Sequence, residues 1–199
     1  MIMTRPETPI TTDKAVANDQ PVIFFDLDGV LSDLGGWAKQ TGKVKPDGKI
    51  DWETLDENWW ATMPAFPGAE EAYDAAKKIA VVKFLSSPAR YPASFAGKAD
   101  WVENFTGVKK LSLRDLILCF ALDKKFLAAP NHILIDDSAN NIKDWIAAGG
   151  IGIHHTGDFK ETLKQLADAV AKLKAAVPST TPVVPKPPIA KVFNRAPKM

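Results

Sequence analysis

The fold of this chain is decided by one stretch near its start, Val22-Ile23-Phe24-Phe25 followed by Asp26-Leu27-Asp28-Gly29. Four consecutive apolar residues, all aromatic or β-branched, predict a strand that is buried on both faces. The abrupt change to two aspartates and a glycine marks the carboxyl end of that strand. Similar apolar runs recur at residues 81–85, 116–119, 133–135 and 151–153. These runs together predict a parallel sheet of five strands.

Amphipathic stretches alternate with these runs, at residues 68–79, 97–105, 138–148 and 158–177. This alternation is typical of α/β proteins, so we predict a Rossmann-like three-layer core around the parallel five-stranded sheet. Residues 32–67 break the alternation, because they contain turn signals and aromatic residues but no strand-like run. A segment of about 35 residues is too long for an ordinary loop after a strand, so we expect a small helical cap there.

Composition favours one soluble domain, because 46% of the 199 residues are hydrophobic and 25% are charged. We expect this domain to span residues 21–177. Residues 1–20 are polar and lack periodicity, and residues 178–199 are proline-rich and basic, so both ends are expected to be disordered. The tail could also serve as a basic docking arm.

Charge and composition exclude several classes of protein. The formal net charge is +1, so no overall field favours binding to nucleic acid or to an anionic membrane. The single cysteine excludes an internal disulfide, and the three histidines lack zinc-ligand spacing. No apolar run is long enough to span a bilayer and no secretory signal is evident, so a cytoplasmic protein is expected.

Polar residues follow the predicted strands. In a doubly wound sheet the ligand site lies outside the carboxyl ends of the strands, so these residues are candidates for function. They are Asp26 and Asp28 after the first strand, Ser86 and Ser87 after the second, Lys124 or Lys125 after the third, and Asp136 and Asp137 after the fourth. Four carboxylates at one point repel one another and need a cation. Oxygen ligands favour a hard ion, so Mg²⁺ is the expected cofactor.

These four elements, in this order, resemble the four motifs of the haloacid dehalogenase superfamily of phosphotransferases. The motifs lie at residues 24–31, 84–88, 124 (or 125) and 134–137, and the resemblance covers about residues 21–157. Pro67-Gly68-Ala69, Trp101-Val102-Glu103 and the Ser-Ser-Pro form of the second motif look most like the 5'(3')-deoxyribonucleotidase family. Its members remove phosphate from nucleoside monophosphates and carry a small helical cap after the first motif. Leu122 and Ser138 stand where that family usually has basic residues.

Hydrolysis of a phosphate ester needs a nucleophile, a proton for the leaving oxygen and positive charge around the phosphoryl group. Asp26 is the expected nucleophile and would form an aspartyl-phosphate. Asp28, two residues on, would protonate the leaving oxygen and then activate water. Lys124 would offset the negative charge, with Lys125 as the alternative.

The remaining candidates bind phosphate or metal. Gly29 permits a sharp turn beside the site, and Ser86 and Ser87 would donate hydrogen bonds to the phosphate. We expect Mg²⁺ to be held by Asp26, the backbone carbonyl of Asp28 and the pair Asp136 and Asp137, with Asp137 as the direct ligand of that pair. Asn141 could orient a carboxylate, although helix capping explains it equally well.

The leaving group should be recognised by the 32–67 segment, with Trp60 and Phe66 as the leading candidates for packing against a base. The expected partner is therefore a small phosphate monoester, most plausibly a nucleoside monophosphate, and a homodimer is compatible with the sequence. Two alternatives stay open. One is a phosphatase for a sugar phosphate or a polynucleotide 3'-phosphate end, and the other is a non-catalytic binding module that recruits a partner through its tail.

Overall fold

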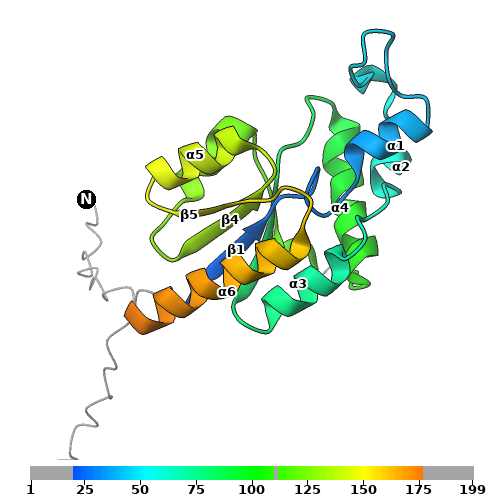
Figure 1. The fold of residues 1–199 in the computed structure, drawn as a ribbon. Helices are drawn as coiled ribbons and strands as arrows, with labels where there is room; N and C mark the ends of the chain where they lie inside the picture. The colour runs from blue at the N-terminus through cyan, green and yellow to red at the C-terminus, as the bar shows by residue number, and fades with distance from the viewer. Residues whose placement is uncertain (1–19, 110–111, 177–199) are drawn as a thin grey trace, which may run out of the picture.

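The computed structural model describes residues 20–109 and 112–176, and in these ranges the chain forms one parallel sheet flanked by helices (Figure 1). The five strands run in the order β3-β2-β1-β4-β5. They are β1 (Val22–Phe25), β2 (Val81–Ser86), β3 (Leu116–Leu118), β4 (His132–Asp136) and β5 (Ile151–His154). The predicted α/β class is therefore confirmed. Residues 1–19 and 178–199, for which the sequence predicts disorder, lie outside the described residues.

Helices connect the strands at the predicted places. They are α1 (Leu34–Gln40), α2 (Glu57–Ala61), α3 (Ala69–Lys77), α4 (Pro92–Thr106), α5 (Ala139–Ala147) and α6 (Phe159–Ala176), with the 3₁₀ turns η1 (Trp52–Thr54), η2 (Ser112–Asp115) and η3 (Ala121–Leu127). Helix α4 begins before its predicted start at residue 97, because Pro92 provides a favourable first turn. Within the described part of the chain, no helix combines the length and apolar character needed to cross a membrane.

The two faces of the sheet are covered by different helices, as side-chain alternation along β1 requires. Ile23 and Phe25 belong to a buried cluster that includes Leu166 of α6. Phe24, between them, points to the opposite face and packs edge-on against Trp145 of α5. Asp26 emerges at the carboxyl end of β1, directly after the residues that are buried on both faces.

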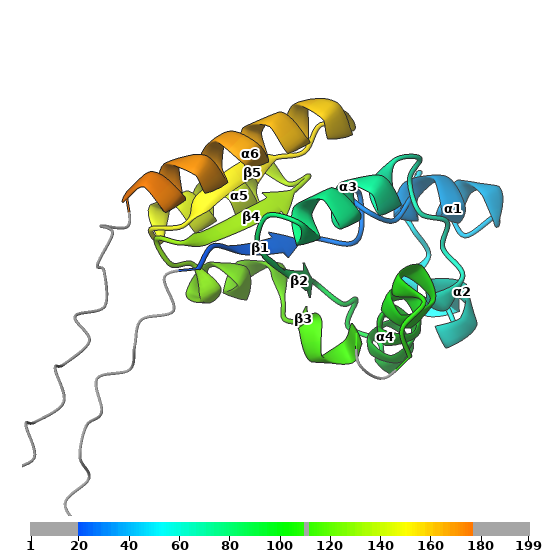
Figure 2. The ribbon, with the colours of Figure 1, turned by 90° about the horizontal axis from the view of Figure 1, so that it is seen from below.

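The 32–67 segment is helical, as predicted, and packs against α4. Figure 2 shows α1, α2 and α4 grouped at the end of the sheet to which the arrow of β1 points. The Trp101 indole of α4 donates a hydrogen bond to the Met63 carbonyl at 2.8 Å. A Cβ atom on Gly97 would lie 2.4 Å from the Cβ of Trp60, so α2 and α4 approach closely only because residue 97 is glycine. The segment is thereby held at the carboxyl end of the sheet.

Candidate active site

A tight loop follows β1 and presents Asp26 at the centre of the sheet edge. The Leu27 carbonyl accepts hydrogen bonds from the amides of Leu31 and Ser32, both at 2.8 Å. These hydrogen bonds form a tight turn that leads into the 32–67 segment. The Leu27 amide in turn donates to Oδ1 of Asp26 at 2.8 Å, and the Asp26 side chain is buried beneath the loop. The backbone therefore fixes one carboxylate oxygen of Asp26 and leaves the other to face the site.

Lys124, rather than Lys125, reaches the acidic residues. It lies on η3 and is 1% exposed. Its Nζ is 3.1 Å from Oδ2 of Asp26 and 2.7 Å from Oδ2 of Asp136. The Lys125 ammonium instead lies 5.8 Å from the centroid of the Phe126 ring. The structure thus places Lys124 in the site, whereas the sequence left Lys124 and Lys125 as alternatives.

Asp136 is held by the start of helix α5. Its Oδ1 accepts a hydrogen bond from the Ser138 amide at 2.9 Å, and the Asn141 amide side chain donates to both carboxylate oxygens at 3.0 Å. The Ser138 hydroxyl also accepts from the backbone amide of Asn141 at 3.4 Å, which caps the helix. Both roles considered for this helix start are therefore present. Asn141 orients the carboxylate, and Ser138 caps the helix.

Asp26, Asp136 and Asp137 form a group in which each carboxylate offers one oxygen, all within 4.8 Å of one another. Three carboxylate oxygens at this spacing suit a hard divalent cation such as Mg²⁺. The carboxylate of Asp28 does not belong to the group. The donor set in this structure therefore fits the metal that the sequence predicts, with the side chain of Asp28 directed elsewhere.

Asp137 sits on a short loop that two neighbours position. The His154 ring donates from Nε2 to the Asp137 carbonyl at 2.8 Å. Gly29 has a φ of 80°, and a Cβ atom there would lie 2.2 Å from Oδ2 of Asp137. Residue 29 must therefore be glycine both for its backbone conformation and for the close approach of this carboxylate.

The electrostatics of the site reflect its burial. Burial raises the pKa of Asp26 to about 7, with Lys124 opposing this and Asp136 adding to it. Burial likewise raises the pKa of Asp137, and the neighbouring Asp136 adds to the shift. Burial disfavours the charged form of Lys124, but Asp26 and Asp136 outweigh burial and raise its pKa. The anionic forms of Asp26 and Asp137 are thus destabilised unless more positive charge is supplied, whereas Lys124 is held as a cation.

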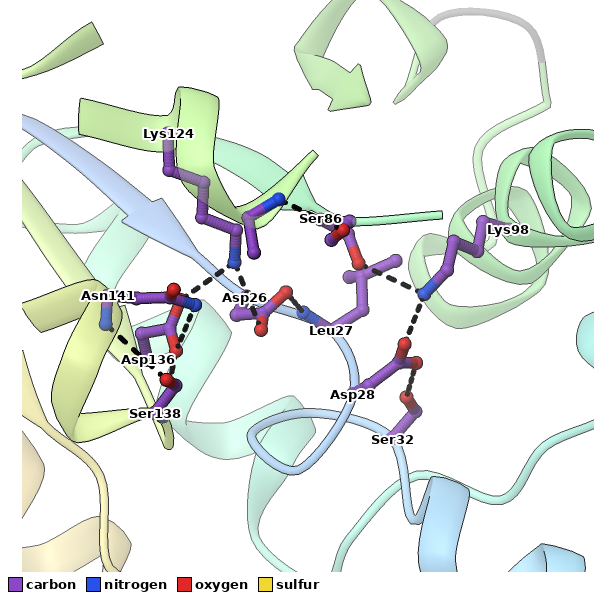
Figure 3. A network of polar contacts seen from close by, with 12 residues as sticks. Asp26, Leu27, Asp28, Ser32, Ser86, Lys98, Lys124, Asp136, Ser138 and Asn141 are labelled. Atoms are coloured by element: carbon purple, nitrogen blue, oxygen red, sulfur yellow. Dashed lines mark hydrogen bonds and ion pairs between the residues drawn. The ribbon is translucent and has the colours of Figure 1, made fainter. Parts of the chain in front are cut away.

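Lys98 lies in the site, although the sequence analysis did not name it. It is fully buried on α4, and its Nζ lies 2.5 Å from Oδ2 of Asp28 and 3.0 Å from the Ser86 hydroxyl. Ser32 donates to the other carboxylate oxygen of Asp28 at 3.2 Å. Figure 3 shows Lys98 and Lys124 reaching toward the loop after β1 from opposite sides. Asp28 is therefore held by an ammonium and a hydroxyl, and Lys98 links it to the second motif.

A sequence signal for Lys98 did exist. The buried residues of α4 are Ser94, Gly97, Lys98, Trp101 and Val102, which recur at the three- and four-residue spacing of one helix face. A lysine on an otherwise small or apolar stripe is rarely buried without a partner. The stripe alone could indicate that Lys98 has such a partner. It could not indicate which carboxylate, because that depends on how α4 packs.

The two serines of the second motif lie at the end of β2, next to β1. Ser86 is fully buried, and its hydroxyl accepts the hydrogen bond from Lys98. The Ser87 hydroxyl accepts a hydrogen bond from the Ala121 amide at 3.1 Å, which ties the motif to the start of η3. Ser86 thus faces the loop that carries Asp26, and Ser87 faces the third motif.

Of the two aromatic candidates, the structure buries Trp60 and leaves Phe66 at the edge of a hollow. Trp60 is 1% exposed, so its ring offers no free face to a base, because α2 presses it against α4. Trp52 stacks on it with ring centroids 6.0 Å apart and is 38% exposed. Phe66 is half-buried and lines a hollow of about 270 Å³ beside Gly29. The open aromatic face in this stack is therefore that of Trp52, and Trp60 is its buried support.

Comparison with known proteins does not assign this chain to a family. No protein-family model matches this chain, and no curated protein matches its sequence. Among solved structures, the crystal structure of a hydrolase from Streptococcus pneumoniae TIGR4 aligns with 75% of this chain and 99% of that chain, at 13% identity and a TM-score of 0.41. A TM-score of this size reflects only loose agreement. The description of the site therefore rests on the geometry of this chain's own residues.

Proposed function

We propose that this protein is a Mg²⁺-dependent phosphomonoesterase of the haloacid dehalogenase type that hydrolyses nucleoside monophosphates through an aspartyl-phosphate on Asp26. The observation that carries this proposal is that two buried lysines meet the loop after β1, Lys124 at Asp26 and Lys98 at Asp28. Phosphoryl transfer needs a nucleophile surrounded by positive charge, and both lysines are buried and directed at this point.

The residues act in two steps. Asp26 attacks phosphorus, the bond from phosphorus to the ester oxygen breaks, and Asp28, which must be in its protonated form for this step, donates its proton to the leaving oxygen. A water molecule then attacks the phosphorylated Asp26 while Asp28 accepts its proton, which releases inorganic phosphate and restores the carboxylate. Lys98 holds Asp28 in place for both proton transfers and, with Ser86, can bind a phosphate oxygen.

The metal site belongs to the same proposal. Asp26, Asp136 and Asp137 would hold Mg²⁺, together with the backbone carbonyl of Asp28. The ion would neutralise part of the negative charge of the phosphoryl group and of the nucleophile. Its positive charge would also favour the ionised form of Asp26, which burial disfavours. Asn141 and Lys124 hold the Asp136 carboxylate from two sides.

A hollow beside the second motif supports a ring-bearing leaving group. It has a volume of about 410 Å³ and is lined by Ser87, Arg90, Tyr91 and Trp52, with Pro88 and Ala89. Trp52 and Tyr91 offer aromatic faces and Arg90 offers a cation, which are groups that stack on a planar base. The lining thus favours a nucleoside over a sugar.

The test is a panel assay of the purified protein. Phosphate release would be measured from ribo- and deoxyribonucleoside monophosphates and from sugar phosphates, with and without Mg²⁺, using Asp26→Asn as the control. We expect Mg²⁺-dependent release with the highest kcat/KM for a nucleoside monophosphate. Faster hydrolysis of a sugar phosphate would reassign the substrate. Phosphate release that Asp26→Asn leaves intact would disprove the covalent mechanism, and no release from any ester would favour the non-catalytic binding module.

A further inference from the structure

Two hollows lie side by side next to the proposed phosphate site and share one residue. The inner hollow is the one of about 410 Å³ that contains Ser87, Trp52 and Tyr91. The outer hollow, of about 660 Å³, is lined by Pro92, Phe95 and Phe120. Arg90 lines both. The ring-lined surface therefore continues outward, beyond what the leaving group of a single nucleotide needs.

The surface that lines the two hollows carries aromatic rings and one guanidinium, and both kinds of group can stack on a base. Tyr91 immediately precedes α4, and Phe95 lies in the first turns of that helix, so both rings are carried by its N-terminal end. The Arg90 guanidinium lies over the Phe120 ring, 5.9 Å from its centroid. Trp52, Tyr91, Phe95 and Phe120 are 36–45% exposed. Each of these residues can therefore present part of a flat face to a ligand.

We propose that this surface binds the end of a short single-stranded oligonucleotide, so that the enzyme removes a terminal phosphate from a di- or trinucleotide faster than from a mononucleotide. The terminal nucleoside occupies the inner hollow and the next base occupies the outer hollow, stacked near Phe120. This inference rests on the proposed phosphatase activity and extends its substrate from one nucleotide to several.

The charge distribution agrees with a short ligand bound by stacking. Among the residues that the structure describes, Arg90 is the only cation that lines either hollow, and the chain as a whole carries a formal charge of +1. Such a surface neutralises one or two phosphates at most, whereas long nucleic acids are bound by tracks of lysine and arginine. We therefore expect kcat/KM to stop rising once the substrate has two or three nucleotides. The preference for these substrates over a mononucleotide should depend only weakly on salt.

The experiment compares kcat/KM for a nucleoside monophosphate with that for a dinucleotide and a trinucleotide bearing a single terminal phosphate, at the 5' or the 3' end. Stacking of one base contributes about five- to a hundredfold in binding, so we expect the dinucleotide to exceed the mononucleotide by a factor in this range. Phe120→Ala should remove most of that gain without changing hydrolysis of the mononucleotide. Trp52→Ala should impair all three substrates.

Phe126→Ala is the matched control, because Phe126 is 77% exposed and lines neither hollow. Equal kcat/KM for mononucleotide and dinucleotide, or equal losses on both in Phe120→Ala, would overturn the inference while leaving the phosphatase activity standing. If no substrate releases phosphate, the proposed function fails. Binding of fluorescently labelled dinucleotide to Asp26→Asn then decides the inference separately, and tighter binding of a phosphorylated peptide in that assay would overturn it.

Discussion

Two regions of this molecule supply the same proposed chemistry and are built in opposite ways. At the sheet edge, Asp26 and Asp136 end neighbouring strands, and Lys124 lies on the turn that follows β3. On the side of α4, Lys98 comes from the middle of a helix and meets Asp28 only because α4 packs against α2. The first region follows from strand order, whereas the second depends on how two helices fit together. Substitutions should therefore affect the two regions differently.

The largest effect is expected at the sheet edge. Asp26→Asn removes the nucleophile, so phosphatase activity should fall at least about a thousandfold. The fold should persist, because the change removes an anion that burial destabilises. Enzyme assays and thermal unfolding of the same preparation measure the two effects. A variant that keeps a substantial fraction of activity, or that unfolds, would contradict this assignment.

Substitution of Lys98 on α4 should lower both the activity and the stability of the protein. Lys98→Met leaves the Asp28 carboxylate without its ammonium partner, and breaking a buried ion pair costs roughly 3 kcal/mol in the free energy of unfolding. We expect kcat/KM to fall about a hundredfold as well.

The double variant Lys98→Met with Asp28→Asn separates these effects. It removes both charges, so much of the lost stability should return while activity stays low. The test is urea unfolding and phosphate-release assays on wild type, on the two single variants Lys98→Met and Asp28→Asn, and on the double variant. Full activity in Lys98→Met despite its lower stability would mean that Lys98 serves the fold alone.

The approach of Gly29 to Asp137 gives a smaller effect with a close control. Gly29→Ala places a Cβ atom against the Asp137 carboxylate, so the Mg²⁺ concentration needed for half-maximal activity should rise about tenfold. Gly42→Ala introduces similar backbone strain, since its φ is 67°, but meets no atom within 4 Å. If both variants changed the Mg²⁺ requirement equally, backbone strain rather than displacement of Asp137 would be the cause.

A few-fold effect is expected at the rim of the same region. His154 donates from Nε2 to the Asp137 carbonyl, and the amide nitrogen of glutamine can replace this donor. His154→Leu should weaken Mg²⁺ activation several-fold, because an exposed hydrogen bond contributes about 1 kcal/mol. His154→Gln should retain near-normal activation. Titrations with Mg²⁺ at constant substrate distinguish the two, and identical behaviour would exclude this positioning role.

The most gradual effect is expected in the pH dependence of stability without Mg²⁺. The pKa of Asp26 rises from 3.8 to about 7 on folding, so between these values the native state binds more protons than the unfolded state. Stability should then fall as pH increases from about 4 to 7, by at most about 1.4 kcal/mol per pH unit for one group. Asp26→Asn should lack this contribution. Urea unfolding across the range measures it, and parallel curves for the two proteins would contradict it.

Much of the sheet edge could be predicted from the residues, because strand ends in a parallel sheet share one edge. Apolar runs identified the five strands, and the polar residues directly after them identified Asp26, Ser86, Asp136 and Asp137. A strand of four residues needs no distant information to be recognised when it is buried on both faces. The order of the strands then brings these residues together with little dependence on side-chain detail.

The sequence by itself therefore determined the fold class and the acidic centre, since both depend on local patterns of apolar and polar residues. Only the tertiary structure decided that Lys124 rather than Lys125 enters the site, that Lys98 binds Asp28, and that Trp52 rather than Trp60 exposes its ring. The physical reason is that each of these choices depends on the rotation and packing of one element against another. Adjacent residues on a helix or turn point in different directions, and only the neighbouring element determines which direction is buried.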